Sequence, residues 1–157
     1  MDVYLVQHGA ATSEAEDPQR PLTAAGRAAV EDVAARLAAG GERAGVCVHS
    51  GKLRAEQTAI ILGAALGAEV VARAGLDPSD RVTATANWLK GEGQRNPAGA
   101  IALVGHLPFL ERLASLLIAG DEGAQVVRFH NAGVVKLVPK PAGAGFSVDS
   151  ILLPGAR

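Results

Sequence analysis

The sequence is poor in aromatic residues and contains a single cysteine, and both shortages narrow what the protein is. Phe, Trp and Tyr together make up 3% of the 157 residues, so the hydrophobic core must be built from Leu, Val, Ile and Ala. Cys47 cannot form an internal disulfide, which favours a reducing compartment such as the cytoplasm. Because Cys47 lies between Val46 and Val48, we expect it to be a small buried hydrophobic residue.

The sequence also lacks an excess of charge and a long hydrophobic run. Lys and Arg number 15 against 16 Asp and Glu, a formal net charge of −1, which argues against a broad surface for nucleic acid or membrane. No apolar segment approaches the ~18 residues that a membrane-spanning helix needs. The first apolar run is interrupted by Gln7, His8 and Gly9, unlike a signal peptide. We therefore expect a cytoplasmic protein with no nucleic-acid partner and no membrane partner.

The alternation of short apolar runs with helical patterns predicts one domain over residues 1–157. Strands are expected at 3–6, 46–49, 69–72, 101–104, 134–138 and 146–153. Helices are expected after Thr23, from about Leu53, after Ser79 or Asp80 as a cap, and after Pro108, whereas the glycine-rich segment 91–99 is predicted to be a loop. This order predicts an α/β fold, a single three-layer domain with a mostly parallel central sheet and helices on both faces.

Polar side chains follow three of the predicted strands, where open α/β sheets bind their ligands. His8 and His106 each follow a strand, and Arg54 lies in the first turn of a helix, where free N–H groups and the helix dipole favour an anion. Gly9 lets the backbone approach a ligand closely. Any one of these residues alone is more often structural, but their placement at equivalent strand ends predicts a phosphate pocket that needs no metal ion.

The same residues belong to motifs that resemble those of the histidine phosphatase superfamily. The opening strand with Gln7-His8-Gly9 resembles its Arg-His-Gly signature. Residues 50–59, Ser-Gly-Lys-Leu-Arg-Ala-Glu-Gln-Thr-Ala, resemble its second signature, Ser-Pro-x-x-Arg-Ala-x-Gln-Thr-Ala, and residues 105–108 resemble the third. The compact length and the Arg-Pro-Leu-Thr-x-x-Gly element from Arg20 are similar to short SixA-type phosphohistidine phosphatases. The resemblance spans almost the whole chain in the right order.

The resemblance implies a phosphoglycerate mutase-like fold and a metal-independent phosphatase without a cofactor. His8 would attack phosphorus and form a transient phosphohistidine that water hydrolyses. Arg54 and His106 would bind the equatorial phosphoryl oxygens, with Gln7, Gly9 and Arg20 completing the phosphate pocket; the alternative for Arg20 is a solvated loop residue. The expected substrate is a protein carrying phosphohistidine or a small phosphorylated metabolite.

Three positions depart from the family pattern or leave alternatives open. Gln7 replaces an arginine, and hydrogen bonds to a charged partner contribute roughly 1.5–3 kcal/mol, about twice a neutral one. A catalytically weakened phosphate-binding module is therefore the alternative function. Gly51 replaces a proline, which loosens the loop before Arg54. Asp77 is a candidate general acid, with Asp80 as a helix cap the competing interpretation of that segment.

Overall fold

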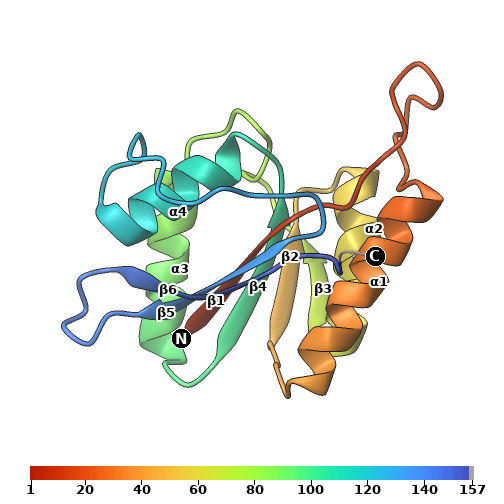
Figure 1. The fold of residues 1–157 in the computed structure, drawn as a ribbon. Helices are drawn as coiled ribbons and strands as arrows, with labels where there is room; N and C mark the ends of the chain where they lie inside the picture. Colours follow the sequence, from red (N-terminus) through yellow and green to blue (C-terminus); the bar gives the residue numbers. More distant parts are fainter. Residues whose placement is uncertain (156–157) are drawn as a thin grey trace.

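A central six-stranded sheet with helices on both sides forms the protein in the computed structural model, which describes residues 1–155 (Figure 1). The strands are β1 (Asp2–Gln7), β2 (Val46–His49), β3 (Glu69–Ala72), β4 (Ala100–Gly105), β5 (Val134–Pro139) and β6 (Phe146–Leu152). Their order is β3-β2-β4-β1-β5-β6. The first four in this order are parallel, whereas β5 runs antiparallel to β1 and β6 antiparallel to β5. The predicted mostly parallel sheet is confirmed.

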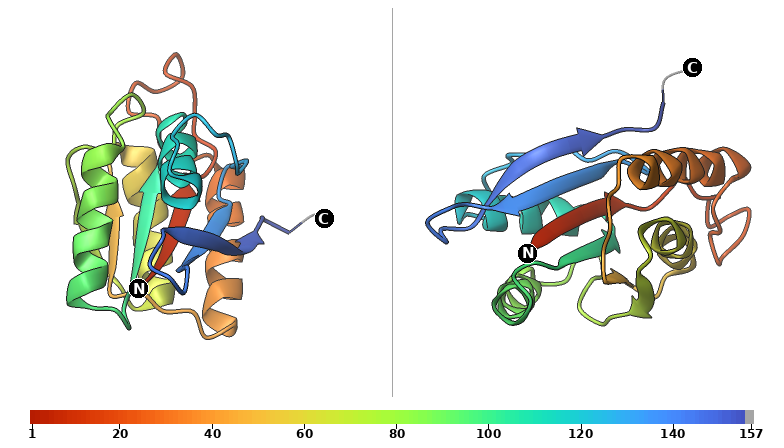
Figure 2. Two further views of the ribbon diagram at one scale, coloured as in Figure 1. Left: turned by 90° about the vertical axis from the view of Figure 1, so that its left-hand side faces the viewer. Right: turned by 90° about the horizontal axis from the view of Figure 1, so that it is seen from below.

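Two helices cover each face of the sheet, as the views in Figure 2 show. The helices are α1 (Ala24–Ala39), α2 (Leu53–Leu66), α3 (Thr83–Arg95) and α4 (Phe109–Ala119). Helices α1 and α2 share one face, and α3 and α4 share the other. Among residues 1–155, no helix is both long and apolar enough to cross a membrane.

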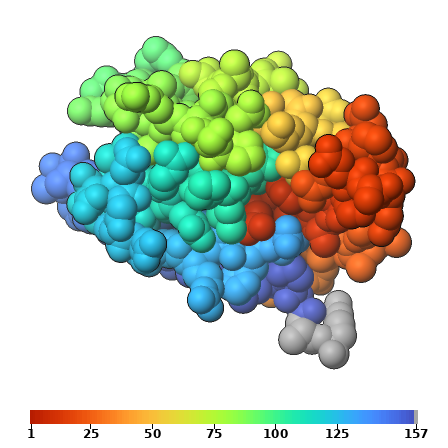
Figure 3. All heavy atoms as spheres, turned by 90° about the horizontal axis from the view of Figure 1, so that it is seen from above, coloured from red at the N-terminus to blue at the C-terminus, as the bar shows by residue number. Residues whose placement is uncertain are grey.

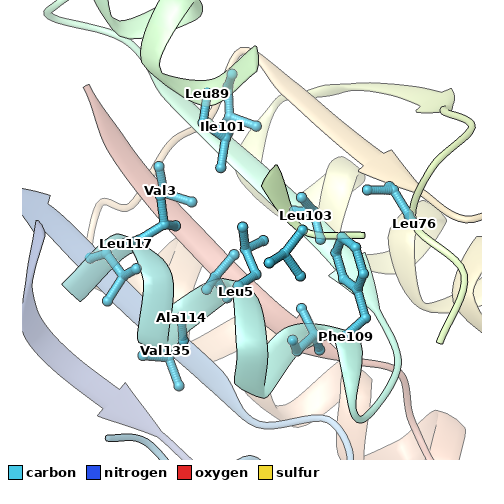
Figure 4. Close-up of a cluster of buried hydrophobic side chains, with 14 of the residues drawn as sticks. Val3, Leu5, Leu76, Leu89, Ile101, Leu103, Phe109, Ala114, Leu117 and Val135 are labelled. Atoms are coloured by element: carbon cyan, nitrogen blue, oxygen red, sulfur yellow. The ribbon is translucent and has the colours of Figure 1, made fainter. Parts of the chain in front are cut away.

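Each face of β1 contributes to a separate hydrophobic core, which explains why this strand is a continuous apolar run. Val3 and Leu5 pack toward α3 and α4 in the cluster that Figure 4 shows, whereas Tyr4 and Val6 pack toward α1 and α2. Aliphatic side chains dominate both clusters, as the scarcity of aromatic residues predicts. Cys47 is fully buried in the second cluster, in agreement with its predicted structural role.

The third helix differs from its prediction at both ends. Helix α3 begins after Val82, and no side chain caps it, so neither Ser79 nor Asp80 is its cap. The helix continues through Gly91 to Arg95, although residues 91–99 were expected to form a loop. Each glycine in an exposed helix costs only about 1 kcal/mol, and burial of Leu89 together with the local ion pair between Glu92 and Arg95 favours the helical conformation.

The chain changes face between two neighbouring strands, so the segments that follow these strands diverge at their carboxyl ends. Strands β1 and β4 are adjacent, but the helix that follows β1 lies on one face and the helix that follows β4 lies on the other. Such switch points are where open α/β sheets bind ligands. Figure 3 looks onto this end of the molecule, where the opening segment, the start of α2 and the segment after β4 meet.

Candidate active site

His8 is held at the switch point by its backbone, which leaves its ring free for chemistry. Its N–H donates to the carbonyl of Gly105 at 3.2 Å, and its own carbonyl accepts from Asn131 Nδ2 at 3.0 Å. Ring atom Nδ1 lies 2.7 Å from the carbonyl oxygen of Gly9. Because a carbonyl oxygen can only accept, Nδ1 carries the proton. The neutral ring therefore has its free electron pair on Nε2, as a nucleophile requires.

The surroundings of His8 favour this neutral form. Burial lowers the pKa of His8, and the positive charges of Arg54 and Arg20 lower it further, although the hydrogen bond to Gly9 acts in the opposite direction. A His pKa below its ordinary value of 6.5 means that the imidazole is mostly unprotonated at neutral pH. Burial and two nearby positive charges thus keep the His8 ring unprotonated, and the charges favour an anion beside it.

His106 follows β4 and lies beside His8. The centroids of the two rings are 5.0 Å apart, and their planes are inclined by 52°. His106 is almost completely buried, and its Nε2 lies 2.6 Å from Ser50 Oγ at the carboxyl end of β2. Three neighbouring parallel strands, β2, β4 and β1, therefore each deliver one polar residue to the same place.

The electrostatic environment of His106 is strongly positive. Burial lowers the pKa of His106 to about 3, and His8, Arg54, Lys52 and Arg20 all act in the same direction. All the charged groups that act on the two imidazole rings are cationic. A site that gathers this much positive potential around two neutral rings fits an oxyanion.

Thr58 joins the segment that carries His8 to the first turn of α2. Its hydroxyl oxygen accepts from the N–H of Gly9 at 3.1 Å, and the hydroxyl donates to the carbonyl of Arg54 at 2.8 Å. A Cβ atom at Gly9 would lie 2.8 Å from Val30 Cγ2, a distance that side chains do not tolerate. Glycine at this position is therefore required by packing against α1, in addition to any approach of a ligand to the backbone.

Gln7 and Arg20 are the two remaining residues that the sequence predicted to hold phosphate. Gln7 is the last residue of β1, and its Oε1 is buried without a hydrogen-bond partner in the described part of the chain. Arg20 has a positive φ of 50°, and its Nε donates to the carbonyl of Thr12 at 3.0 Å. Arg20 is half-buried, and its charge acts on both His8 and His106. The loop between β1 and α1 thus brings a guanidinium near the rings, whereas Gln7 offers a neutral amide.

Unpaired buried polar atoms are concentrated at this site. Five buried side-chain nitrogen or oxygen atoms within residues 1–155 have no hydrogen-bond partner, and three of them are Gln7 Oε1, Arg54 Nε and His106 Nδ1. An unpaired buried polar atom costs roughly 1–3 kcal/mol, so native proteins keep few of them. Their clustering in residues predicted from the sequence to hold phosphate indicates a site whose polar groups are completed by a ligand.

Comparison with known proteins identifies the family. A family model described as the histidine phosphatase superfamily (branch 1) matches residues 3–80. The chain belongs to the histidine phosphatase superfamily. An uncharacterized protein of Picosynechococcus sp. is 36% identical over 141 residues, which cover 87% of this chain and 84% of that protein.

Solved structures of phosphatases share the whole fold. The protein histidine phosphatase SixA complexed with tungstate superimposes with a TM-score of 0.85 at 23% identity, over 98% of this chain and 97% of that chain. Phosphoserine phosphatase of Entamoeba histolytica, in complex with 3-phosphoglyceric acid, gives 0.73 at 15% identity, over 96% and 95% of the two chains. The phosphoglycerate mutase-like fold expected from the resemblance is confirmed.

Three residues of this histidine phosphatase domain lie at the site although the sequence motifs assign them no individual role. Ser50 opens the second signature and directly follows β2, so its strand-end position was a signal that could have found it. Lys52 lies two residues before Arg54 in the same signature. Asn131, which binds the carbonyl of His8, lies in the loop before β5 and carries no local signal.

The structure does not bring the candidate general acid onto the rings. The Asp77 side chain is 54% exposed, and its Oδ1 lies 3.9 Å from Lys52 Nζ. Asp80 Oδ2 accepts from the N–H of Asp77 at 2.8 Å, which closes a turn rather than capping α3. Within residues 1–155, no group of three or more His, Cys, Asp or Glu side chains could hold a metal ion.

Proposed function

We propose that the protein is a phosphatase that removes a phosphoryl group from phosphohistidine, or from a related phosphoester, through a covalent intermediate on His8. The observation that carries the proposal is the orientation of the His8 ring. Its Nδ1 donates to the Gly9 carbonyl, so its Nε2 is left unprotonated. The centroid of the His8 ring lies 5.0 Å from the centroid of the His106 ring. Membership of the histidine phosphatase superfamily supports the same reaction class.

Both chemical steps follow from this orientation. The Nε2 electron pair of His8 attacks phosphorus in line, a P–Nε2 bond forms, and the bond from phosphorus to the leaving group breaks. The leaving imidazole or oxygen takes up a proton from solvent water. Water then attacks phosphorus, the P–Nε2 bond breaks, and inorganic phosphate leaves with His8 returned to its neutral form. The Gly9 carbonyl keeps the same tautomer throughout both steps.

Arg54 and His106 are suited to stabilise the charge that develops on the equatorial oxygens. Arg54 offers a guanidinium whose Nε has no other partner within residues 1–155. His106 is neutral before the substrate binds, because its pKa is about 3. A bound phosphoryl dianion raises the pKa of this ring, since an opposite charge favours the imidazolium. We infer that Arg54 carries the permanent charge and that His106 adjusts its protonation to the bound oxyanion.

The charge pattern supports phosphohistidine as the substrate class. An alkoxide leaving group needs a general acid, whereas an imidazole is a better leaving group and depends less on one. The charged groups acting on His8 and His106 include no carboxylate, and Asp77 is exposed and paired with Lys52. A site without a positioned acid therefore favours cleavage of a P–N bond over cleavage of a sugar phosphate ester.

Trapping the intermediate tests the proposal. A peptide with ³²P-labelled phosphohistidine is mixed with the enzyme and quenched in alkali, where phosphohistidine survives, and label on the protein is measured beside phosphate release. The native protein should be labelled and turn over, and His8→Ala should lose both, by about 10⁴-fold or more in rate. His130→Ala is the matched control, because His130 is exposed. Turnover that survives His8→Ala would contradict the proposal.

Gln7 favours a second candidate function, a phosphate-binding module with weakened catalysis. An arginine that binds the transition state contributes ~10³–10⁵ in rate at some phosphoryl-transfer sites, and the amide of Gln7 carries no charge. Such a module would bind phosphohistidine peptide but release no more phosphate than one equivalent per site. Steady multiple turnover of the peptide or of p-nitrophenyl phosphate, lost in His8→Ala, would exclude it.

A further inference from the structure

Because Gln7 is neutral, it does not supply the positive charge that the family arginine would bring to the site. Another residue must therefore supply that charge. Gln7 Oε1 is buried and has no partner within residues 1–155, so this amide does not bring a cation to the rings by pairing with one. Besides His8, the charges that lower the pKa of His106 come from Arg54, Lys52 and Arg20, in decreasing order of effect. Of these three, Lys52 is the one for which the family signature specifies no residue type.

The backbone of Lys52 is one hydrogen bond away from His106. Lys52 precedes α2 as its N-cap residue, and its N–H donates to Ser50 Oγ at 3.4 Å. The same Ser50 Oγ lies 2.6 Å from His106 Nε2. The start of α2 thus places the Lys52 backbone next to the ring pair, and the Lys52 charge acts on His106.

The present partner of Lys52 is easily exchanged. Lys52 Nζ lies 3.9 Å from Asp77 Oδ1, and the two side chains are 39% and 54% exposed. An exposed ion pair at this separation contributes little to stability, because water screens it and two long side chains must be held in one geometry. A lysine ammonium is a mobile point charge on four rotatable bonds and can move from a carboxylate to a phosphoryl oxygen.

We propose that Lys52 binds the phosphoryl oxyanion and supplies the positive charge that Gln7 does not provide. In this arrangement Asp77 neutralises Lys52 while the site is empty of substrate and releases it when a dianion binds between Arg54 and the two histidines. The inference rests on the proposed function for the identity of the bound group. It assigns to Lys52 alone the positive charge that is missing at position 7.

A double-mutant cycle with inorganic tungstate as the probe tests the proposal. Tungstate affinity is measured by calorimetry for the native protein, Lys52→Gln, Gln7→Arg and the double variant, with kcat/KM for p-nitrophenyl phosphate measured beside it. Lys52→Gln should weaken tungstate binding by about 10- to 150-fold, the effect of one charge-assisted hydrogen bond. In the Gln7→Arg background the same substitution should cost less than about threefold, because the two cations share one task.

Two controls separate a binding role from a structural one. Lys90→Gln removes an exposed lysine from the second half of α3 and should leave the affinity unchanged. Lys52→Arg keeps the charge and should retain most of the affinity. The proposal is overturned if Lys52→Gln binds tungstate as Lys90→Gln does, or if its cost is equal in both backgrounds. Because the probe reports binding, tungstate held by a protein that hydrolyses nothing would refute the phosphatase function and still decide the role of Lys52. Failure of the native protein to bind tungstate would overturn both.

Discussion

The imidazole rings of His8 and His106 lie with their centroids 5.0 Å apart, each at the end of one of two neighbouring strands. At this separation a proton on one ring disfavours a proton on the other, and the pKa of His106 is lowered by His8 for this reason, after burial. Both rings are therefore neutral near pH 7.

The pH dependence of turnover follows from the lowered pKa of His8. Protonation of Nε2 removes the nucleophile, so kcat/KM should fall as the pH drops below the pKa of His8 and should stay level above it. Because burial holds this pKa below 6.5, the acid limb should have its midpoint below pH 6.5. The measurement is kcat/KM for p-nitrophenyl phosphate between pH 4 and pH 8, restricted to the range in which the far-ultraviolet circular dichroism is unchanged. A midpoint above 6.5 would refute this assignment.

Removal of the Ser50 hydroxyl should impair catalysis. Ser50→Ala leaves His106 Nε2 buried without its partner at 2.6 Å, which frees the ring to rotate and leaves a buried polar atom unpaired. We expect kcat/KM to fall by about 10-fold or more, in line with the roughly 1–3 kcal/mol attached to such an atom. Ser115→Ala is the control for loss of a serine hydroxyl, because Ser115 is buried and its hydroxyl has no hydrogen-bond partner within residues 1–155. Equal activity in the two variants would mean that Ser50 does not position His106.

Thr58 should prove essential for holding the two halves of the site together. Thr58→Val keeps the side-chain shape but removes both the acceptor for the Gly9 N–H and the donor to the Arg54 carbonyl. The free energy of unfolding should fall by roughly 1–3 kcal/mol, and kcat should fall with it because Gly9 orients the His8 ring. Urea denaturation and steady-state kinetics measure the two effects. Thr58→Ser retains the hydroxyl and should restore most of both; a Thr58→Ser protein as impaired as Thr58→Val would show that the methyl group matters instead.

The family proline should not fit at position 51 in this protein. Gly51 has a φ of +91°, and its N–H donates to His49 Nδ1 at 3.1 Å. Proline fixes φ near −65° and has no N–H, so Gly51→Pro should lower the free energy of unfolding by about 2 kcal/mol or more. Thermal unfolding measures the loss, and kcat/KM should fall because the loop carries Ser50. Gly51→Ala keeps the N–H and has only the cost of a positive φ. Its stability and its kcat/KM should therefore lie between those of the native protein and those of Gly51→Pro. A stable and fully active Gly51→Pro would mean that the loop adopts the family conformation at no cost.

Much of the fold and part of the site could be predicted from the sequence because the signals are local. The apolar runs of β1, β2 and β4 and the capped start of α1 at Thr23 depend on neighbours in the chain, and the structure has them where the periodicity indicates. The convergence of His8 and His106 follows from the rule that parallel strands end at one edge of a sheet. The end of α3 escaped prediction because two glycines suggested a loop, while the packing of Leu89 favoured a helix.

The sequence by itself determined the order of strands and helices, the family, and which residues stand at the strand ends. Only the tertiary structure decided which ring nitrogen of His8 is free, since that depends on the carbonyl of Gly9 in the folded loop. It alone brought Asn131 to the His8 backbone. It also placed the Lys52 ammonium beside Asp77, with the Lys52 charge acting on His106. These relations join residues that are distant in the chain or depend on side-chain direction, and neither distance nor direction is encoded in a local pattern.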